Sequence, residues 1–120
     1  MPDLLIDTDV FIDQIRGAGT IPPQLHRVWY SVVTRAELFA GDAAEEAAIA
    51  DLLSVYSEIP VDRGIAERAG RLRRRSAIGM PDALIAATAL EWEMDLVSRN
   101  RRDFEHIVGL RLRDPARLTE

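Results

Sequence analysis

The sequence predicts a three-layer α/β/α fold in which helices cover both faces of a short parallel sheet. Its apolar residues form short continuous runs rather than alternating ones, as in strands buried on both faces. Segments with helical spacing separate these runs, and parallel strands need such crossovers. The 120 residues, 48% of them apolar and 29% charged, suffice for one core, so a single domain over residues 1–120 is expected.

Two strands and two helices are expected in the first forty residues. Leu4 to Ile6 is a buried strand that ends in acids, and a helix follows it. Asp7 and Asp9 are both candidates for the N-cap of this helix, and Asp9 fits that role better. Val28 to Val33 is the second strand, after which Thr34-Arg35-Ala36-Glu37 has the form of a helix capping box.

The middle of the chain predicts two more helices around a weak strand. Apolar residues recur at helical spacing from Ala43 to Tyr56, after a break and cap at Gly41-Asp42. Ile59 to Val61 is a short strand at best. Asp62 then caps a helix that ends in the cluster Arg71 to Arg75, where cations suit the negative end of the helix dipole.

The last third of the chain predicts the centre of the fold and one edge of the sheet. Gly79-Met80-Pro81 breaks the chain before Ala83 to Trp92, a helix that is apolar on nearly every face and is therefore expected to be central. Leu96 to Ser98 is the next buried strand, and Leu110 to Arg113 is a last strand at an edge. Ligands of such sheets lie outside the carboxyl ends of the strands, so functional residues are expected there.

Composition removes several classes of site. Without cysteine, the chain has no disulfides, thiolate metal sites or cysteine nucleophiles, so any metal is held by oxygen or imidazole. No apolar stretch is long enough to span a membrane, and the amino terminus lacks the basic region of a signal peptide, so a cytoplasmic location is expected. The net charge of −5 argues weakly against general nucleic-acid binding, although all fifteen basic residues are arginines and several are clustered.

Four acids follow the expected strands or open the expected helices: Asp7, Glu37, Asp82 and Asp103. Each alone has a structural explanation, as a helix cap, a capping-box partner, a first-turn acid and a solvated loop acid respectively. Together they occupy positions that converge at the carboxyl edge of a parallel sheet. Crowded carboxylates repel one another, and divalent cations relieve that repulsion.

Such a pocket suits Mg²⁺ or Mn²⁺, which prefer oxygen ligands and keep coordination sites open for a phosphate. Two ions about 4 Å apart can clamp the attacking and leaving oxygens of a phosphodiester displacement. Neither His26 nor His106 has a partner at metal-binding spacing, and both are interpreted as structural or surface residues. The acids therefore predict phosphoryl chemistry that needs no histidine base.

Four segments that span nearly the whole chain carry a family resemblance. They are Leu5–Asp13 (LIDTDVFID), Ser31–Leu38 (SVVTRAEL), Asp82–Ala89 (DALIAATA) and Ser98–Phe104 (SRNRRDF). With these segments in this order, the sequence resembles PIN-domain ribonucleases, and among them the VapC-type toxins of toxin–antitoxin pairs.

The resemblance implies a PIN-like fold and a Mg²⁺- or Mn²⁺-dependent endoribonuclease that cuts RNA. It also implies inhibition by a cognate antitoxin protein and, often, a homodimer. By motif position, Asp7 and Asp82 are the metal ligands, while Glu37 and Asp103 complete the set of catalytic acids.

Two positions depart from the family pattern. Asp9 stands where many relatives have Ser, which adds a negative charge beside Asp7. Asn100 stands where some relatives carry the last acid, so the role assigned to Asp103 is open between these two residues.

Two further surfaces are suggested by the resemblance. Arginines that flank the last acid are expected either to hold RNA phosphates or to be solvated surface charges: Arg99, Arg101 and Arg102. An extended antitoxin segment would lie in a groove, and three aromatic residues either line it or belong to the core: Trp29, Phe39 and Tyr56.

Two rival functions stay open from the sequence. Leu4-Leu5-Ile6-Asp7-Thr8-Asp9-Val10 also fits a phosphatase of the haloacid dehalogenase type, with Asp7 as nucleophile and Asp9 as general acid. Such enzymes usually use a lysine, and the chain has none, although arginine can substitute. The other rival is a PIN-like binding module without catalysis, against which the presence of all four acids speaks.

Overall fold

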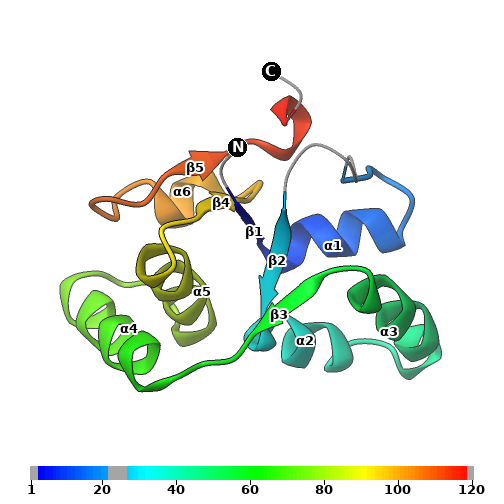
Figure 1. Cartoon of the computed structure of the whole chain (residues 1–120), viewed down its shortest axis with the longest axis horizontal. Coiled ribbons are helices and arrows are strands. Elements are labelled where there is room, and N and C mark those ends of the chain that lie inside the picture. Colours follow the sequence, from blue (N-terminus) through cyan, green and yellow to red (C-terminus); the bar gives the residue numbers. More distant parts are fainter. Residues whose placement is uncertain (1–2, 22–26, 119–120) are drawn as a thin grey trace.

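The computed structural model of the chain describes residues 3–21 and 27–118 (Figure 1). Its strands are β1 (Leu4–Ile6), β2 (Val28–Ser31), β3 (Ser57–Ile59), β4 (Asp95–Val97) and β5 (Leu112–Arg113). Its helices are α1 (Thr8–Ile15), α2 (Val32–Phe39), α3 (Glu46–Ser54), α4 (Arg63–Arg75), α5 (Met80–Glu91) and α6 (Arg101–Phe104). Short 3₁₀ turns are η1 (Ala43–Glu45) and η2 (Pro115–Arg117).

The five strands form one sheet in the order β3-β2-β1-β4-β5, and every neighbouring pair is parallel. Helices α1, α2 and α3 lie on one side of the sheet, and α4 and α5 lie on the other (Figure 1). This arrangement confirms the predicted three-layer α/β/α fold. Within the described ranges, no helix is long and apolar enough to cross a membrane.

Alternating side chains of β1 feed two separate cores. Leu4 and Ile6 pack into the core that contains Phe11 of α1, whereas Leu5 packs into the core that contains Ile65 of α4. Successive strand residues point to opposite faces, so a strand covered on both faces must be apolar at every position. The run Leu4–Ile6 is apolar at every position because helices cover both faces of β1.

Helix α5 is central, as its composition predicted. Ala83, Ala86, Ala87 and Ala89 are fully buried, and these small side chains let α4 and the sheet approach the helix closely. The helix begins earlier than expected, because Gly79 is its N-cap and Pro81 occupies its first turn.

Two predicted helix starts are wrong. Asp7, not Asp9, is the N-cap of α1, and its carboxylate accepts a hydrogen bond from the backbone N–H of Thr8 at 2.9 Å. Ser31 caps α2 by accepting from the N–H of Val33 at 3.0 Å, so the expected capping box at Thr34 does not form. The sheet pairs only residues up to Ser31 of this run, which frees the next residue to begin a helix.

Smaller differences occur at the other elements. The weak strand lies at β3, Ser57–Ile59, rather than at Ile59 to Val61. Helix α6 forms within a segment expected to be a loop, because Phe104 is buried and anchors it against the core. The edge strand β5 is confirmed, whereas His26, which was interpreted as a structural or surface residue, lies outside the described residues.

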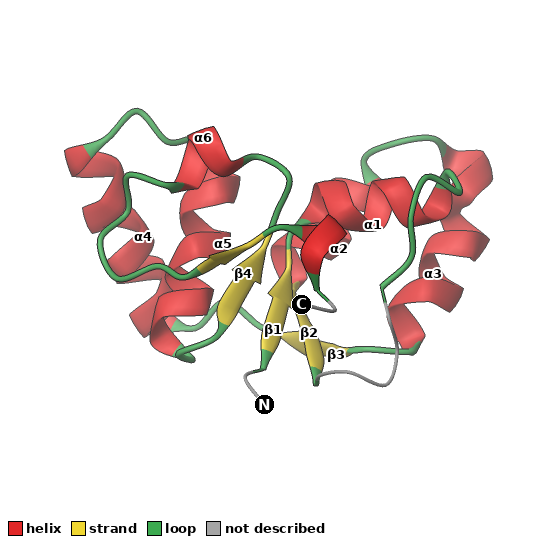
Figure 2. Ribbon diagram, turned by 90° about the horizontal axis from the view of Figure 1, so that it is seen from above, coloured by secondary structure: helices red, strands yellow, loops and turns green. Residues whose placement is uncertain are grey.

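The connections locate a switch point in the sheet. The chain runs outward from β1 through β2 to β3, and then returns by way of α4 and α5 to β4 on the other side of β1 (Figure 2). A crevice opens where strand order reverses, at the carboxyl ends of the two strands concerned. Here those strands are β1 and β4, which Asp7 and Ser98 immediately follow.

We expect Phe11→Ala to lower the free energy of unfolding by about 3–5 kcal/mol, because the truncation leaves a cavity in a filled core. Urea denaturation followed by circular dichroism measures this change. Phe39→Ala is the matched control, since Phe39 is 36% exposed. An equal loss in both variants would show that the α1 core does not hold the sheet.

Candidate active site

Asp7 stands at the switch point between β1 and β4. Its backbone N–H donates to the carbonyl of Val97 at 2.9 Å, which ties the end of β1 to the end of β4. Its carboxylate accepts from the Thr8 N–H at 2.9 Å and from the Ser98 hydroxyl at 2.8 Å. Only 4% of the residue is exposed, so these bonds fix a buried carboxyl group in one orientation.

Burial, together with the charges of Asp9 and Asp82, raises the pKa of Asp7 to about 7. The hydrogen bonds from Ser98 and from the Thr8 backbone oppose this shift, because they stabilise the ionised form. Asp7 is therefore poised between its acid and its carboxylate form near neutral pH. A nearby cation would favour the carboxylate.

Two threonines join the first acid to the second helix. The Thr8 hydroxyl donates to Glu37 Oε1 at 2.6 Å, and it lies 3.0 Å from the Thr34 hydroxyl. Thr34 is fully buried, so α2 carries Glu37 to the mouth of the sheet in a fixed register. Glu37 thus bonds to a residue of α1 instead of capping its own helix.

Asp82 occupies the first turn of α5, where the helix dipole favours a negative charge. Burial raises its pKa, and the charges of Glu37, Asp103 and Asp9 raise it further, in that order. Asp7 feels the charge of Asp82 in turn. The four acids that the sequence singled out are therefore near enough to one another for the charges of Glu37, Asp103 and Asp9 to act on Asp82, and for that of Asp82 to act on Asp7.

Asp9 lies within α1 rather than at its cap, and its side chain is 13% exposed. Both of its carboxylate oxygens are buried and accept no hydrogen bond of normal geometry. Burial raises its pKa, while Arg99 lowers it. Arg99 Nε is 3.7 Å from Asp9 but 2.9 Å from Asp13, so this arginine is held mainly by Asp13.

The last acid and its neighbour occupy different places. Asp103 lies on α6 and is exposed, and its charge reaches Asp82. Asn100 precedes α6, its side chain makes no capping bond, and its backbone N–H donates to Ser98 Oγ at 3.0 Å. Of these two residues, Asp103 is the one whose charge contributes to the raised pKa of Asp82.

Sequence reasoning missed Ser98, which binds both Asp7 and the backbone of Asn100. The available signal was its position at the end of a buried strand. Among the residues described, no three acidic or histidine side chains stand close enough to form a ready-made metal cage. His106 is exposed, as expected.

A basic groove with a volume of about 690 Å³ adjoins Asp7 on the side of β5. Four arginines line it, together with Ser98, Leu112 and Asp114: Arg99, Arg101, Arg113 and Arg117. Two of the three arginines singled out in the sequence therefore share this groove, whereas Arg102 is exposed without lining it.

A second groove, of about 330 Å³, lies between α1, α2 and α3. The apolar residues of its floor are Ile12, Ile15, Leu38 and Ile49. Its rim carries three acids and one arginine: Glu37, Asp42, Glu45 and Arg16. The aromatic residues expected in a groove do not line this one. Tyr56 packs on Phe11, and Trp29 packs on Trp92.

Comparisons with known proteins agree with this geometry. The family model described as PIN domain matches residues 4–110. A relative named Ribonuclease VapC10, from Mycobacterium tuberculosis, is 35% identical, and the match covers 81% of this chain and 82% of the relative.

Solved structures with the same fold are toxin–antitoxin complexes. DNA-bound VapBC from Salmonella typhimurium matches with a TM-score of 0.85 and 26% identity, over 96% of this chain and 99% of that chain. A toxin–antitoxin complex from Klebsiella pneumoniae matches with a TM-score of 0.73 and 29% identity, over 93% and 97%. On the family match, the chain belongs to the PIN domain family and is a relative of the VapC ribonucleases.

Proposed function

We propose that this chain is a metal-dependent endoribonuclease that acts as the toxin of a toxin–antitoxin pair and hydrolyses RNA phosphodiester bonds. The observation that carries the proposal is the acid pocket itself. Asp82 at the start of α5 feels the charges of Glu37, Asp103 and Asp9, and it acts on Asp7 at the switch point. The ribonuclease names of the relatives supply the substrate class.

A divalent cation fits this pocket on the chemistry of its donors. The buried oxygens of Asp9 accept no hydrogen bond of normal geometry, and burial and mutual repulsion raise the pKa values of Asp7 and Asp82. Asp7 and Asp82 would hold the ion, which is Mg²⁺ or Mn²⁺, since both prefer oxygen ligands. When bound, such an ion polarises a phosphate oxygen and activates water.

The residues around the acids do the positioning. Ser98 and the backbone of Thr8 orient the carboxylate of Asp7, and Thr8 orients Glu37 with support from Thr34. Because Asp7 holds a proton near neutral pH in the free protein, it must release that proton before it can act as a ligand. The proposed metal affinity therefore rises with pH through about 7.

The proposed partner is an antitoxin protein, because structural neighbours of the chain occur in toxin–antitoxin and VapBC complexes. The groove between α1, α2 and α3 suits a segment with apolar and basic side chains, because its floor is apolar and its rim is mainly acidic. The proposal also takes residues 1–120 as one domain and includes a homodimer, as the family resemblance implies.

RNA cleavage tests the function directly. Wild type should cut single-stranded RNA with Mg²⁺ or Mn²⁺ and stop when EDTA is added, because the acids alone supply no electrophile. Asp7→Asn and Asp82→Asn should lower the cleavage rate by at least about 100-fold, an effect on the scale of removing one electrostatic catalytic group. Gel assays with labelled RNA measure the rate.

Asp51→Asn, on the exposed face of α3, is the control for cleavage. If the Asp7 and Asp82 variants cut as wild type does, the metal pocket is wrong. Hydrolysis of p-nitrophenyl phosphate that is lost in Asp9→Asn would instead support the phosphatase alternative.

Asp7→Asn should stabilise the metal-free protein at pH 8 by about 1–3 kcal/mol. The folded pKa of about 7 lies above the ordinary value of 3.8, so the stability that protonated Asp7 contributes is present below pH 4 and is lost as pH rises through 7. Unfolding in urea with EDTA, at pH 4 and at pH 8, measures the difference. The variant should match wild type near pH 4, and a gain of equal size at both pH values contradicts the assigned cause.

Glu45→Lys should weaken binding of the antitoxin, because it removes one acid from the rim of the second groove and places a cation there. Glu46→Lys is the matched control, since it makes the same charge change at the next residue, which is exposed and does not line the groove. Titration calorimetry with the cognate antitoxin measures both affinities. Equal losses would mean that net charge, and not this groove, governs binding.

A further inference from the structure

We propose that the basic groove beside Asp7 binds the RNA strand that is being cut, at a phosphate next to the scissile one. This inference rests on the proposed function, because it extends the acid pocket into a path for the substrate. Its residues come from the segment that follows β4, from α6, from β5 and from the turn at η2, and the last two were not expected from the sequence to take part in binding.

The groove meets the cluster of acids at Ser98. Ser98 lines the groove and donates its hydroxyl to Asp7 at 2.8 Å, so one side chain belongs to both surfaces. β5 lies two strands away from β1 in the sheet, a separation of roughly 10 Å. A strand of RNA that presents one phosphate to the acids therefore reaches the groove with a neighbouring phosphate.

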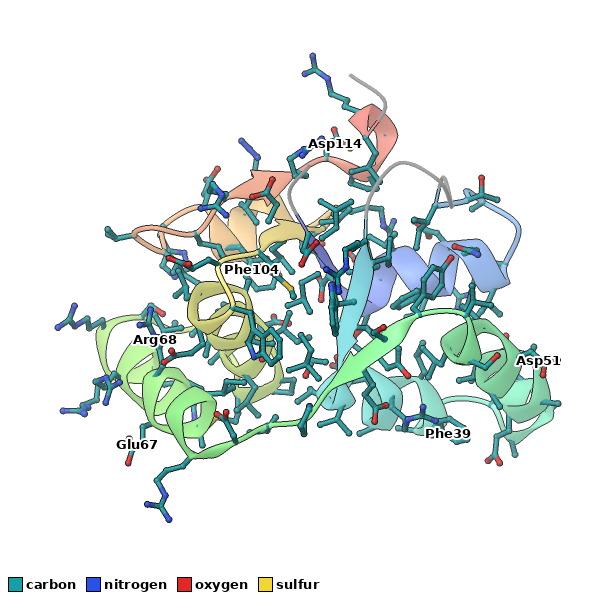
Figure 3. All side chains as sticks on the ribbon, in the orientation of Figure 1. Phe39, Asp51, Glu67, Arg68, Phe104 and Asp114 are labelled. Atoms are coloured by element: carbon teal, nitrogen blue, oxygen red, sulfur yellow. The ribbon has the colours of Figure 1, made fainter. Side chains whose placement is uncertain are left out.

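The charge of the groove fits phosphate. Four arginines face one acid, Asp114, whose carboxylate is already engaged as the N-cap of η2 by the N–H of Ala116 at 2.9 Å. Figure 3 labels Asp114 beside this turn, close to the carboxyl-terminal end of the described chain. Arginine suits phosphate because its planar fork presents several donors to the oxygens.

Two of the arginines are held in position and a third is available. Arg113 Nη1 pairs with Asp95 at 3.2 Å, and Arg99 pairs with Asp13 at 2.9 Å, so both are fixed by acids on their inner side. In the part of the chain that the structure describes, no acid lies within 4.0 Å of the Arg101 guanidinium. Arg101 is therefore the strongest single candidate for a phosphate contact.

The lining favours RNA over an acidic protein segment. Leu112 is the one apolar residue among the seven that line this groove, whereas four apolar side chains form the floor of the groove between α1, α2 and α3. Protein segments bind through buried apolar anchors, while nucleic acid binds through its phosphates. The two grooves thus have the characters expected for two different ligands.

The test is the salt dependence of RNA binding. A short fluorescein-labelled single-stranded RNA is titrated with wild type in EDTA, and anisotropy is recorded at salt concentrations between about 50 and 200 mM. Each lost phosphate contact should lower the slope of log K against log salt by about 0.7 for single strands. We expect this change in Arg101→Gln and in Arg113→Gln, and a larger one in the double variant.

Matched variants guard against general effects. Arg63→Gln removes the same charge from the exposed start of α4, outside the groove, and should leave the slope unchanged. Arg113→Lys keeps a cation beside Asp95, so it should restore most of the slope if Arg113→Gln acts through charge. Circular dichroism confirms that each variant is folded, and Arg101→Gln tests the groove even if Arg113→Gln unfolds.

Each outcome decides the matter. Equal changes in Arg63→Gln and Arg101→Gln would overturn the groove, and so would an unchanged slope in Arg101→Gln. A poly-glutamate peptide that binds with dependence on Arg101, where RNA does not, would make the groove a protein site and overturn the proposal. If RNA binds through the groove but wild type never cuts it with Mg²⁺ or Mn²⁺, the proposed function fails and the groove stands.

Discussion

The burial of the Asp7 carboxyl group at the junction of β1 and β4 is the constraint on which the rest of the site depends. A buried carboxylate is costly unless it is hydrogen-bonded or paired with a cation. The chain meets this cost in part with two hydrogen bonds, from the Thr8 backbone and the Ser98 hydroxyl. The cost of burial that these bonds do not offset raises the pKa of Asp7 to about 7. A cation close to Asp7 would favour its ionised form.

The same junction explains why distant segments meet. The Asp7 backbone is bonded to Val97, and Thr8 in the first turn of α1 reaches across to α2. Helix α5, which brings Asp82, is apolar on all faces because it lies between the sheet and α4. The most buried helix among the described residues thus carries a charged residue in its first turn.

Two surfaces of opposite character flank the acids. On the α1–α3 side the groove has an apolar floor and an acidic rim, and on the β5 side the groove is lined by arginines. The net charge of −5 for the whole chain does not reveal that one groove is mainly acidic and the other mainly basic. Local charge therefore decides what can bind at each side, because exposed charges act over about 8–10 Å at physiological ionic strength.

The sequence by itself determined the layers and the central helix, and it singled out the acids whose charges act on one another in the fold. Continuous apolar runs and helical spacing depend only on which residues need burial, and Leu4 to Ile6 are buried at every position, as are most positions of α5 between Ala83 and Ala89. The predicted helix starts were wrong where a local capping pattern competed with a contact from a segment distant in the sequence. The hydroxyls of Thr8 and Thr34 pair across two helices, so Glu37 does not cap its own helix.

Only the tertiary structure decided the partners of those acids. The bond from Ser98 to Asp7 joins residues 91 positions apart, and the arginines of the basic groove come from segments that meet only when β5 pairs with β4. Such contacts leave no periodic trace in a sequence, because they depend on strand order and not on spacing. The sequence predicted which residues carry the chemistry, and the fold decided which of them act on one another.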